Sequence, residues 1–448
     1  MTWKHKLTYG VGDMSISLVV TIVGAYFAIF LTDIVGIPAG KAAIVVLIGH
    51  TWDWVNDPLV GYLSDRTRSR WGRRRPYLLF GAVPFGIAFV LMWWRPPIES
   101  QSLLLVYYAA AYLLFDAAIT VVYMPYVALT PELTQDYDER TSLTSYRMAF
   151  SIFASLVAFV LPATIVGTFS PENARRFLLM GVIFGAASIG PILVSFLGTR
   201  ERPAYTHQEQ PRLLPSIRAA LRNKPFVFSM VMFLLTWTAI ALLQPTLLYF
   251  MKHAVGRESQ SDLIMAAIFV TALVALPIWL VIANRADKRR AFVIGISFWA
   301  VVQVILITLT PQSGLFLIIG ACFLAGIGVA AAHVLPWSII PDAIEWDEWH
   351  TGVRHEGMFY SIVTLLQKVA SSVAVPLALL LLEASGYLAA SDTQPESAIR
   401  AIRVLVGPIP AVLLIAAIVF AVFYPIDREQ HHRIVAELEA RRAEEGAV

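Results

Sequence analysis

The segment from His50 to Asp65, HTWDWVNDPLVGYLSD, places two carboxylates inside a long apolar stretch. Asp53 and Asp57 lie four residues apart, so on a helix their side chains share one face, about 6 Å apart along the axis. A carboxylate near the centre of a bilayer costs several kcal/mol unless a bound cation, a proton or a basic side chain compensates it. The segment therefore predicts a membrane helix that carries a functional pair of acids. A static salt bridge between two helices is the structural alternative.

The whole chain has the composition of a membrane protein. Of its 448 residues, 58% are hydrophobic and only 15% are charged, and the mean hydropathy is +0.67, whereas about a quarter of the residues in a soluble domain are charged. Its single cysteine, Cys322, excludes an internal disulfide. The net charge of +3 is too small to indicate nucleic-acid binding. No phosphate-binding loop, nucleophile elbow or catalytic Cys–His signature occurs, so we predict neither an enzyme nor an ATP-driven transporter, and no organic cofactor.

Twelve apolar runs are long enough to cross a bilayer, which takes about 20 residues of helix. Their approximate limits are 8–35, 40–64, 76–95, 102–130, 142–168, 176–198, 224–251, 262–283, 291–310, 314–340, 357–387 and 403–424. Lys and Arg number 24 on the side that holds both termini and eight on the other side, with two more inside runs. By the positive-inside rule, both termini are predicted to be cytoplasmic, in a multi-pass protein of the cell (cytoplasmic) membrane.

The runs divide into two sets of six. Residues 1–198 and 224–427 are the two predicted halves, with a central cytoplasmic loop at 199–223 and a solvated cytoplasmic tail at 428–448. GYLSDRTRSRWGRRRP after the second run and ANRADKRRA after the eighth occupy equivalent positions in the two halves. Such repeats are typical of secondary transporters, which bind their substrate near the midplane between the repeats. We expect an all-α transporter that functions as a monomer.

Other charged residues also lie inside apolar runs. Lys368 lies about eleven residues into the eleventh run, near mid-bilayer, and is the predicted counter-charge of Asp53 or Asp57 in coupling; a structural ion pair is the alternative. Arg147 begins the fifth run and is predicted to bind an anionic or hydroxyl-rich substrate, unless it snorkels to the surface. Further candidates for coupling or substrate binding are Asp13, Asp116, Tyr123, Tyr126 and Trp337, with Trp52 as another aromatic that can stack on a substrate or simply pack.

An acidic segment, PDAIEWDEWHTGVRHEG, follows the tenth run and is predicted to be a cytoplasmic loop. Its His and carboxylate spacing fits no local zinc motif. We expect it to face the Arg-rich DRTRSRWGRRR after the second run, so that ion pairs close the cytoplasmic side. The predicted gate residues are Asp65, Arg73, Arg74, Asp342, Glu345 and Asp347.

Four stretches resemble one transporter family. KLTYGVGDMSISL, TWDWVNDPLVGYLSDRTRSRWGRRRPYLL, YMPYVALTPELTQDYDERTSLTSYRM and PWSIIPDAIEWDEWHTGVRHEGMFYSIVTLLQK are similar to the glycoside–pentoside–hexuronide:cation symporters, the branch of the major facilitator superfamily that contains the melibiose permease. The resemblance covers nearly the whole chain. It implies the twelve-helix major facilitator fold and symport of a sugar or glycoside by alternating access, with Na⁺, Li⁺ or H⁺ as the coupling ion. The family's two cation-site carboxylates fall on Asp53 and Asp57, which would be metal ligands if the ion is Na⁺, and its helix-11 lysine falls on Lys368.

Three positions depart from the family pattern. The permease's sugar-binding aspartates fall on Ser17 and Tyr123, and a neighbouring tryptophan falls on Val127. These losses argue against a melibiose-like galactoside and leave H⁺ coupling as open as Na⁺ coupling. The chain also resembles the animal sodium-dependent lysophosphatidylcholine symporters, in SYRM around Arg147 and in LPWSIIPD. An amphipathic, lysolipid-like substrate is therefore one alternative, and a membrane receptor or scaffold that does not transport is another.

Overall fold

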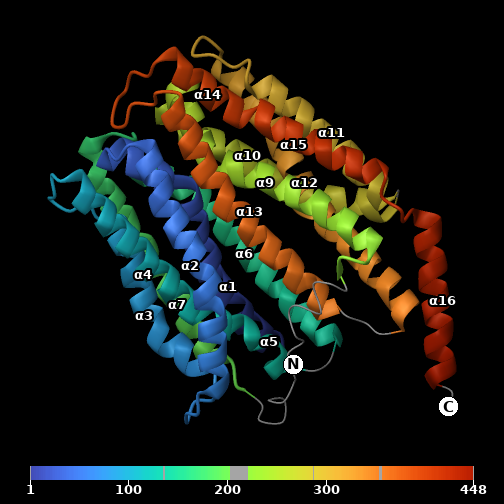
Figure 1. Ribbon diagram of the computed structural model, residues 1–448. Coiled ribbons are helices and arrows are strands. Elements are labelled where there is room, and N and C mark those ends of the chain that lie inside the picture. Colours follow the sequence, from blue (N-terminus) through green and yellow to red (C-terminus); the bar gives the residue numbers. More distant parts are fainter. Residues whose placement is uncertain (1, 135–136, 202–219, 286, 353–355, 447–448) are drawn as a thin grey trace. The chain divides into compact units, whose positions relative to one another are not determined.

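The computed structural model describes residues 2–134, 137–201, 220–285, 287–352 and 356–446. Within these ranges all regular structure is helical (Figure 1). A helix satisfies its backbone hydrogen bonds within one segment, and this is what apolar segments without access to water require.

The described residues of the first predicted half form seven α-helices. They are α1 (Trp3–Ile29) with its π-helical continuation η1 (Phe30–Val35), α2 (Ala39–Arg66), α3 (Arg75–Met92), α4 (Gln101–Ala128), the short α5 (Thr130–Leu133), α6 (Tyr137–Val166) and, after the turn η2 (Pro171–Asn173), α7 (Ala174–Gly198).

The second predicted half also begins with a long helix that continues into a π-helical segment. Its elements are α9 (Lys224–Tyr249) with the π-helical η4 (Phe250–Ala254), the turn η5 (Glu258–Gln260), α10 (Ser261–Arg285), α11 (Lys288–Leu306), α12 (Leu315–Thr351), α13 (Glu356–Ala384), α14 (Glu396–Val406) and α15 (Pro408–Val422), followed by the tail helix α16 (Arg428–Gly446).

Each predicted apolar run contains a helix. Among the described residues, eleven helices are long and apolar enough to cross a membrane. The helix α2 is also long, with 28 residues, and its described apolar part is Ala39–Trp52. The all-α membrane architecture is thus confirmed, while the count of twelve spans and the side of the termini stay predictions.

Three segments differ from the sequence-based expectation. The helix α12 continues to Thr351 and ends at Gly352, whose φ of 70° is a left-handed C-cap, so most of the expected acidic loop is helical. The last run breaks between α14 and α15 at Gly407 and Pro408, where proline cannot continue the backbone hydrogen bonding. The tail is not merely solvated, because α16 packs against α12 and buries Ile434 and Leu438.

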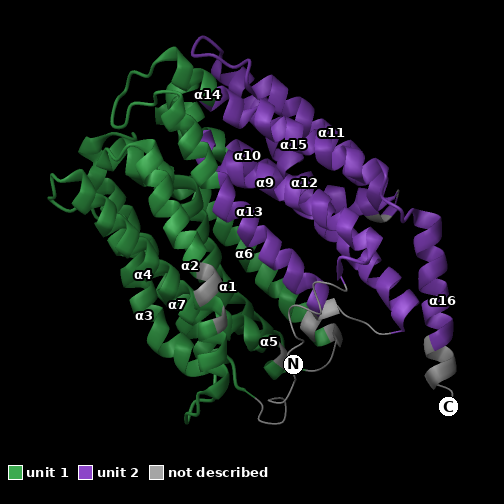
Figure 2. Cartoon of the chain, in the orientation of Figure 1, with its two compact units in different colours: residues 1–209, 248–266, 375–401 green, residues 210–247, 267–374, 402–448 purple. Residues whose placement is uncertain are grey.

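The chain forms two compact units (Figure 2). The first contains residues 1–209, 248–266 and 375–401, and the second contains residues 210–247, 267–374 and 402–448. In the first unit α1 packs against α6 and α7, α2 against α4, and α3 against α4 and α7; in the second, α11 packs against α12 and α15. The first unit thus includes η4 and the α13–α14 connection, which come from the second predicted half.

A close helix crossing between α3 and α7 depends on two glycines. A Cβ on Gly185 would lie 2.9 Å from the backbone oxygen of Gly86, and a Cβ on Gly86 would lie 2.8 Å from the backbone oxygen of Gly185. Small residues at such crossings let two membrane helices pack backbone to backbone.

We expect Gly185→Ala to lower the melting temperature of the detergent-purified protein, because the added methyl group meets backbone that cannot rotate away. The control is Gly190→Ala on the same helix, where nothing lies within 4 Å of the added carbon; alanine there is neutral or stabilising, since it favours helix by up to about 1 kcal/mol. Equal melting temperatures for the two variants would contradict the close crossing.

Candidate functional site

The α2–α4 pair carries the predicted cation-binding acids. The half-buried Asp57 on α2 accepts a hydrogen bond from the Thr120 hydroxyl on α4, with 3.2 Å between the oxygens. The buried Asn56 donates its side-chain NH₂ to the backbone oxygen of Asp116 on α4, also at 3.2 Å. Asp53 lies one turn earlier on α2, and its side chain lies outside the described residues.

The oxygen atoms of Asp57 and Thr120 therefore meet between two apolar helices. Asp116 and Thr120 are four residues apart on α4 and share a face, and both side chains are buried. Carboxylate, hydroxyl and carbonyl oxygens are the ligands that hard cations prefer. Sequence reasoning missed Thr120 and Asn56; the i+4 spacing from Asp116 and the position next to Asp57 were the available signals.

The predicted substrate residue Arg147, on α6, lies inside the first unit. Its guanidinium donates to Asp13 on α1 at 3.1 Å, and the two side chains are 11% and 9% exposed. The guanidinium also lies 5.3 Å from the centre of the Tyr126 ring. Two sequence candidates are thus brought together as a buried ion pair, and the alternative of a snorkelling arginine does not fit this burial.

Tyr126 is held by α1. Its ring stacks on Tyr9 at 5.0 Å between centroids, and its hydroxyl donates to the backbone oxygen of Tyr9 at 2.7 Å. Its main contacts are therefore packing contacts. Tyr123, which like Tyr126 is on α4, is half-buried. The Ser17 hydroxyl of α1 lies 2.5 Å from the Ser151 hydroxyl of α6.

Two other candidates belong to the second unit. Trp337 packs edge-on against Phe233, with 4.9 Å between ring centroids, and lies parallel to Tyr360 at 6.4 Å, so it contributes to the core of that unit. Lys368 is half-buried on α13. Its pairing with Asp53 or Asp57 stays a prediction.

The Arg-rich predicted gate residues find their partners within the first unit. Arg74 contacts Asp65 and Glu132, each at 2.6 Å, and Arg73 contacts Glu132 at 2.6 Å. Glu132, only 3% exposed, was missed by sequence reasoning, although it directly follows the Thr-Pro pair after α4. Glu201 was missed as well, and its carboxylate accepts the backbone N–H groups of Arg73, Arg74 and Arg75 at 2.6, 2.7 and 2.9 Å. It thereby caps the start of α3, where unpaired N–H groups favour a negative charge.

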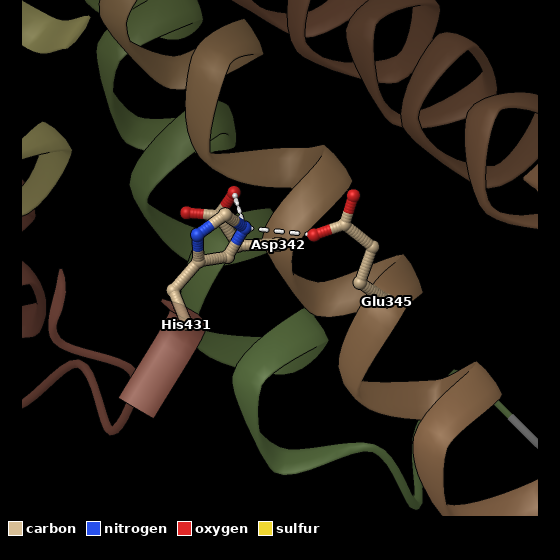
Figure 3. Close-up of side chains that lie close together, drawn as sticks. All are labelled: Asp342, Glu345 and His431. Atoms are coloured by element: carbon tan, nitrogen blue, oxygen red, sulfur yellow. Dashed lines mark hydrogen bonds and ion pairs between the residues drawn. The ribbon is translucent and has the colours of Figure 1, made fainter. Parts of the chain in front are cut away.

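The acidic predicted gate residues find partners within the second unit. Asp342 lies 2.5 Å from the Lys288 ammonium. His431 lies 3.3 Å from Asp342 and 2.7 Å from Glu345 (Figure 3). The hydrogen bond to Glu345 raises the pKa of His431 above its ordinary value, against the lowering effect of burial. Asp347 is buried further along α12. Ion pairing between this acidic segment and the Arg-rich one stays a prediction.

The first unit also contains a buried charge network around Asp33 that sequence reasoning did not single out. Asp33, on η1, has no exposed surface. Its carboxylate lies 2.6 Å from the Lys252 ammonium and 3.3 Å from His253, and accepts hydrogen bonds from Tyr387 at 2.5 Å and Thr32 at 2.8 Å.

The network joins the corresponding ends of the two predicted halves. The first helix of each half ends in a π-helical segment, η1 as FLTDIV and η4 as FMKHA, and such segments are frequent at functional sites. Asp33 lies in the first and Lys252 in the second. The equivalent place of these charges in the repeat was the signal that could have revealed them.

An apolar groove of about 470 Å³ lies along α3 and α4 and is lined by Thr67, Pro76, Tyr77, Phe80, Gly81, Pro84, Leu114, Ala117, Ala118 and Val121. Phe80 and Leu114 are exposed, as expected of helix surfaces that face lipid. The groove therefore does not distinguish a sugar from an amphipathic substrate.

Residues 8–428 match the family model described as MFS/sugar transport protein. The chain belongs to this family. A protein of this family is a multi-pass membrane transporter and not an enzyme, as the sequence predicted. A bacterial homologue of the iron transporter ferroportin, solved in an inward-facing state, has the same fold, with a TM-score of 0.63 at 14% identity over 94% of this chain and 96% of that one.

Curated relatives span almost the whole length of the chain. An uncharacterized symporter of Synechocystis is 34% identical over 98% of this chain and 96% of its own. An uncharacterized symporter of Bacillus subtilis is 29% identical, over 98% and 95% respectively. Sodium-dependent lysophosphatidylcholine symporter 1 of Homo sapiens is 27% identical, over 98% and 89%.

The Asp33 network gives a stability prediction. Lys252→Met should destabilise the purified protein by about 3–5 kcal/mol, because it leaves a buried carboxylate without its counter-charge. The double variant Asp33→Asn/Lys252→Met should recover most of that loss. Thermal or denaturant unfolding in detergent measures both effects.

The matched control is Asp392→Asn. Asp392 lies 3.8 Å from the same lysine but is 87% exposed, so its loss should change stability little. If Lys252→Met and Asp392→Asn unfold alike, Asp33 does not depend on Lys252.

Proposed function

We propose that this protein is a cation-coupled symporter that works by alternating access. The observation that carries the proposal is the acid pair of α2, in which Asp57 meets the Thr120 hydroxyl of α4 inside an apolar helix pair. Acids in such a place are typical of ion pathways. The names of the relatives support symport, and those described as sodium-dependent favour Na⁺, with H⁺ as the second candidate.

In the proposed cycle the cation binds to Asp53 and Asp57, with Thr120 as a further oxygen ligand. Lys368 is the counter-charge when the ion has left. Cation binding neutralises buried charge and so lowers the cost of occluding the site, which lets fully loaded and fully empty carriers reorient while half-loaded ones do not. Cation and substrate then raise each other's affinity by the same factor.

The proposed polar contact of the substrate is Arg147. Its Nη2 donates to Asp13, while its Nε is buried and has no hydrogen-bond partner among the described residues. A buried donor without a partner is costly, and a hydroxyl or phosphate oxygen of a substrate would satisfy it. Asp13 at the same time limits the net charge that the substrate meets.

Two substrate classes fit this arrangement. A sugar or glycoside agrees with the family description. A lysophospholipid or another amphipathic solute is favoured by the sodium-dependent relatives, and by Ser17, Tyr123 and Val127, which replace the sugar-binding side chains of the permease pattern.

The two ends of the transport path are proposed to close by different contacts. The Asp33–Lys252 network holds the ends of η1 and η4 together on the side opposite to the predicted cytoplasmic face. On the cytoplasmic side, the Arg73–Arg74 segment and the acidic end of α12 are the proposed partners. Exchange between these two sets of contacts would accompany each reorientation of the carrier.

The cation site is tested by two substitutions. Asp57→Asn should leave the protein folded and abolish cation-stimulated substrate binding. Thr120→Val keeps the shape of the side chain and removes one oxygen ligand, so the apparent cation affinity should fall about tenfold or more. The control is Thr164→Val on α6, because the Thr164 hydroxyl is exposed and donates to the Leu161 backbone oxygen of its own helix. Unchanged cation dependence in Asp57→Asn would rule out the assignment.

The substrate class is tested by uptake into vesicles reconstituted with the purified protein. Sugars, glycosides and lysophosphatidylcholine are offered with and without Na⁺ at two pH values. We expect uptake of one class that depends on either the Na⁺ or the H⁺ gradient. Binding without uptake or counterflow of any compound would instead identify a receptor or scaffold that keeps the fold.

A further inference from the structure

Three potential metal ligands meet where the tail helix returns to the second unit. Asp342 and Glu345 lie three residues apart on α12 and therefore share a face, and His431 approaches them from the first turn of α16 (Figure 3). One donor atom from each residue lies within 4.8 Å of the others. The cluster combines residues about 90 positions apart, so no local motif could have revealed it.

We propose that Asp342, Glu345 and His431 bind a divalent transition-metal ion that fastens the tail helix α16 to the end of α12. One imidazole nitrogen and two carboxylate oxygens form a ligand set that suits Zn²⁺ and related first-row ions. Asp342 and Glu345 are also among the predicted gate residues, but the inference does not depend on the substrate or the coupling ion.

The distances are close to those of a coordination site. Metal–ligand bonds of about 2.0–2.1 Å in a tetrahedron place neighbouring ligand atoms roughly 3.3 Å apart. His431 Nε2 already lies 3.3 Å from Asp342 Oδ1. Its distance to Glu345 Oε2 is 2.7 Å, and the donor atoms of Asp342 and Glu345 lie within 4.8 Å of each other. Side-chain adjustment therefore brings the three atoms to the spacing of a coordination site. Three protein ligands leave a fourth position for water.

A buried hydroxyl beside the cluster points to a further polar ligand there. Tyr424 is 2% exposed, and its hydroxyl has no hydrogen-bond partner among the described residues. It lines the same cavity of about 170 Å³ as Asp342 and His431. An orphaned buried hydroxyl is unfavourable, and a water molecule on a bound metal would supply the missing partner.

Lys288 competes with the metal ion. Its ammonium lies 2.5 Å from Asp342 Oδ1 and offsets one of the two negative charges. A carboxylate has a second oxygen, so the lysine contact and a metal bond can coexist on Asp342, although the positive charge weakens metal binding. This competition predicts that removing the lysine strengthens binding, which a purely structural ion-pair network would not do.

The remaining contacts of α16 bring His431 to the site without a metal. The Trp349 indole N–H donates to Glu437 at 2.7 Å, and Arg441 donates to the backbone oxygen of Trp349 at 2.9 Å. Because these contacts hold the tail in place, a variant of His431 should keep the fold and lose only the metal ligand.

The test is to measure Zn²⁺ binding to the full-length protein in detergent by calorimetry. We expect one ion per chain whose affinity falls at least about tenfold in His431→Ala and rises in Lys288→Met. His432→Ala, which changes the neighbouring histidine, should bind as the wild type does. Zn²⁺ should also slow hydrogen exchange in α16 of the wild type and leave that of His431→Ala unchanged.

Equal Zn²⁺ affinities for His431→Ala and His432→Ala would mean an adventitious ion only and would overturn the proposal. So would weaker binding by Lys288→Met, or bound Zn²⁺ that leaves hydrogen exchange in α16 unaltered. Since none of these measurements involves transport, their failure is distinguishable from failure of the proposed symport.

Discussion

A charged side chain that is buried among apolar helices must be paired, because nothing around it can replace water. Four of the buried carboxylates described above obey this constraint. Asp33 lies against Lys252, Asp13 against Arg147, Glu132 against two arginines and Asp342 against Lys288. Since breaking one such pair leaves an uncompensated charge, these contacts also decide which helices lie together.

The buried acids differ in whether their counter-charge is a fixed side chain or a mobile ion. The partners of Asp33 and Glu132 are side chains, and they join helix ends to one another. Asp57 accepts a hydrogen bond from a hydroxyl, and in the proposed function its counter-charge is an ion that can leave. When the neutralising charge is a mobile ion, the free energy of burying the acid pair depends on whether the ion is bound. This dependence is the physical basis of coupling in the proposed cycle.

The acidic end of α12 extends the same principle to the tail. Hydropathy falls after Ile340 because acids enter the sequence, and that fall predicts a loop. The helix nevertheless continues, since the acids are compensated by Lys288 from α11 and His431 from α16 rather than by water alone. A polar tail helix thereby becomes part of the packed unit.

The sequence by itself determined the all-helical membrane fold, the transporter family and the acid pair of α2. These follow from local properties, namely the length of apolar runs, the four-residue spacing of Asp53 and Asp57, and contiguous motifs. Sequence reasoning also selected Arg147 and Asp13 separately, but it did not join them.

Only the tertiary structure decided which charged and polar groups meet. Thr120 lies 63 residues from Asp57, Arg147 lies 134 from Asp13, and Lys252 lies 219 from Asp33. Such pairings depend on the depth and rotation of each helix, which are set by packing against its neighbours and not by its own hydropathy. The sequence therefore shows which side chains need a partner, and the packing of the helices decides which partner each one has.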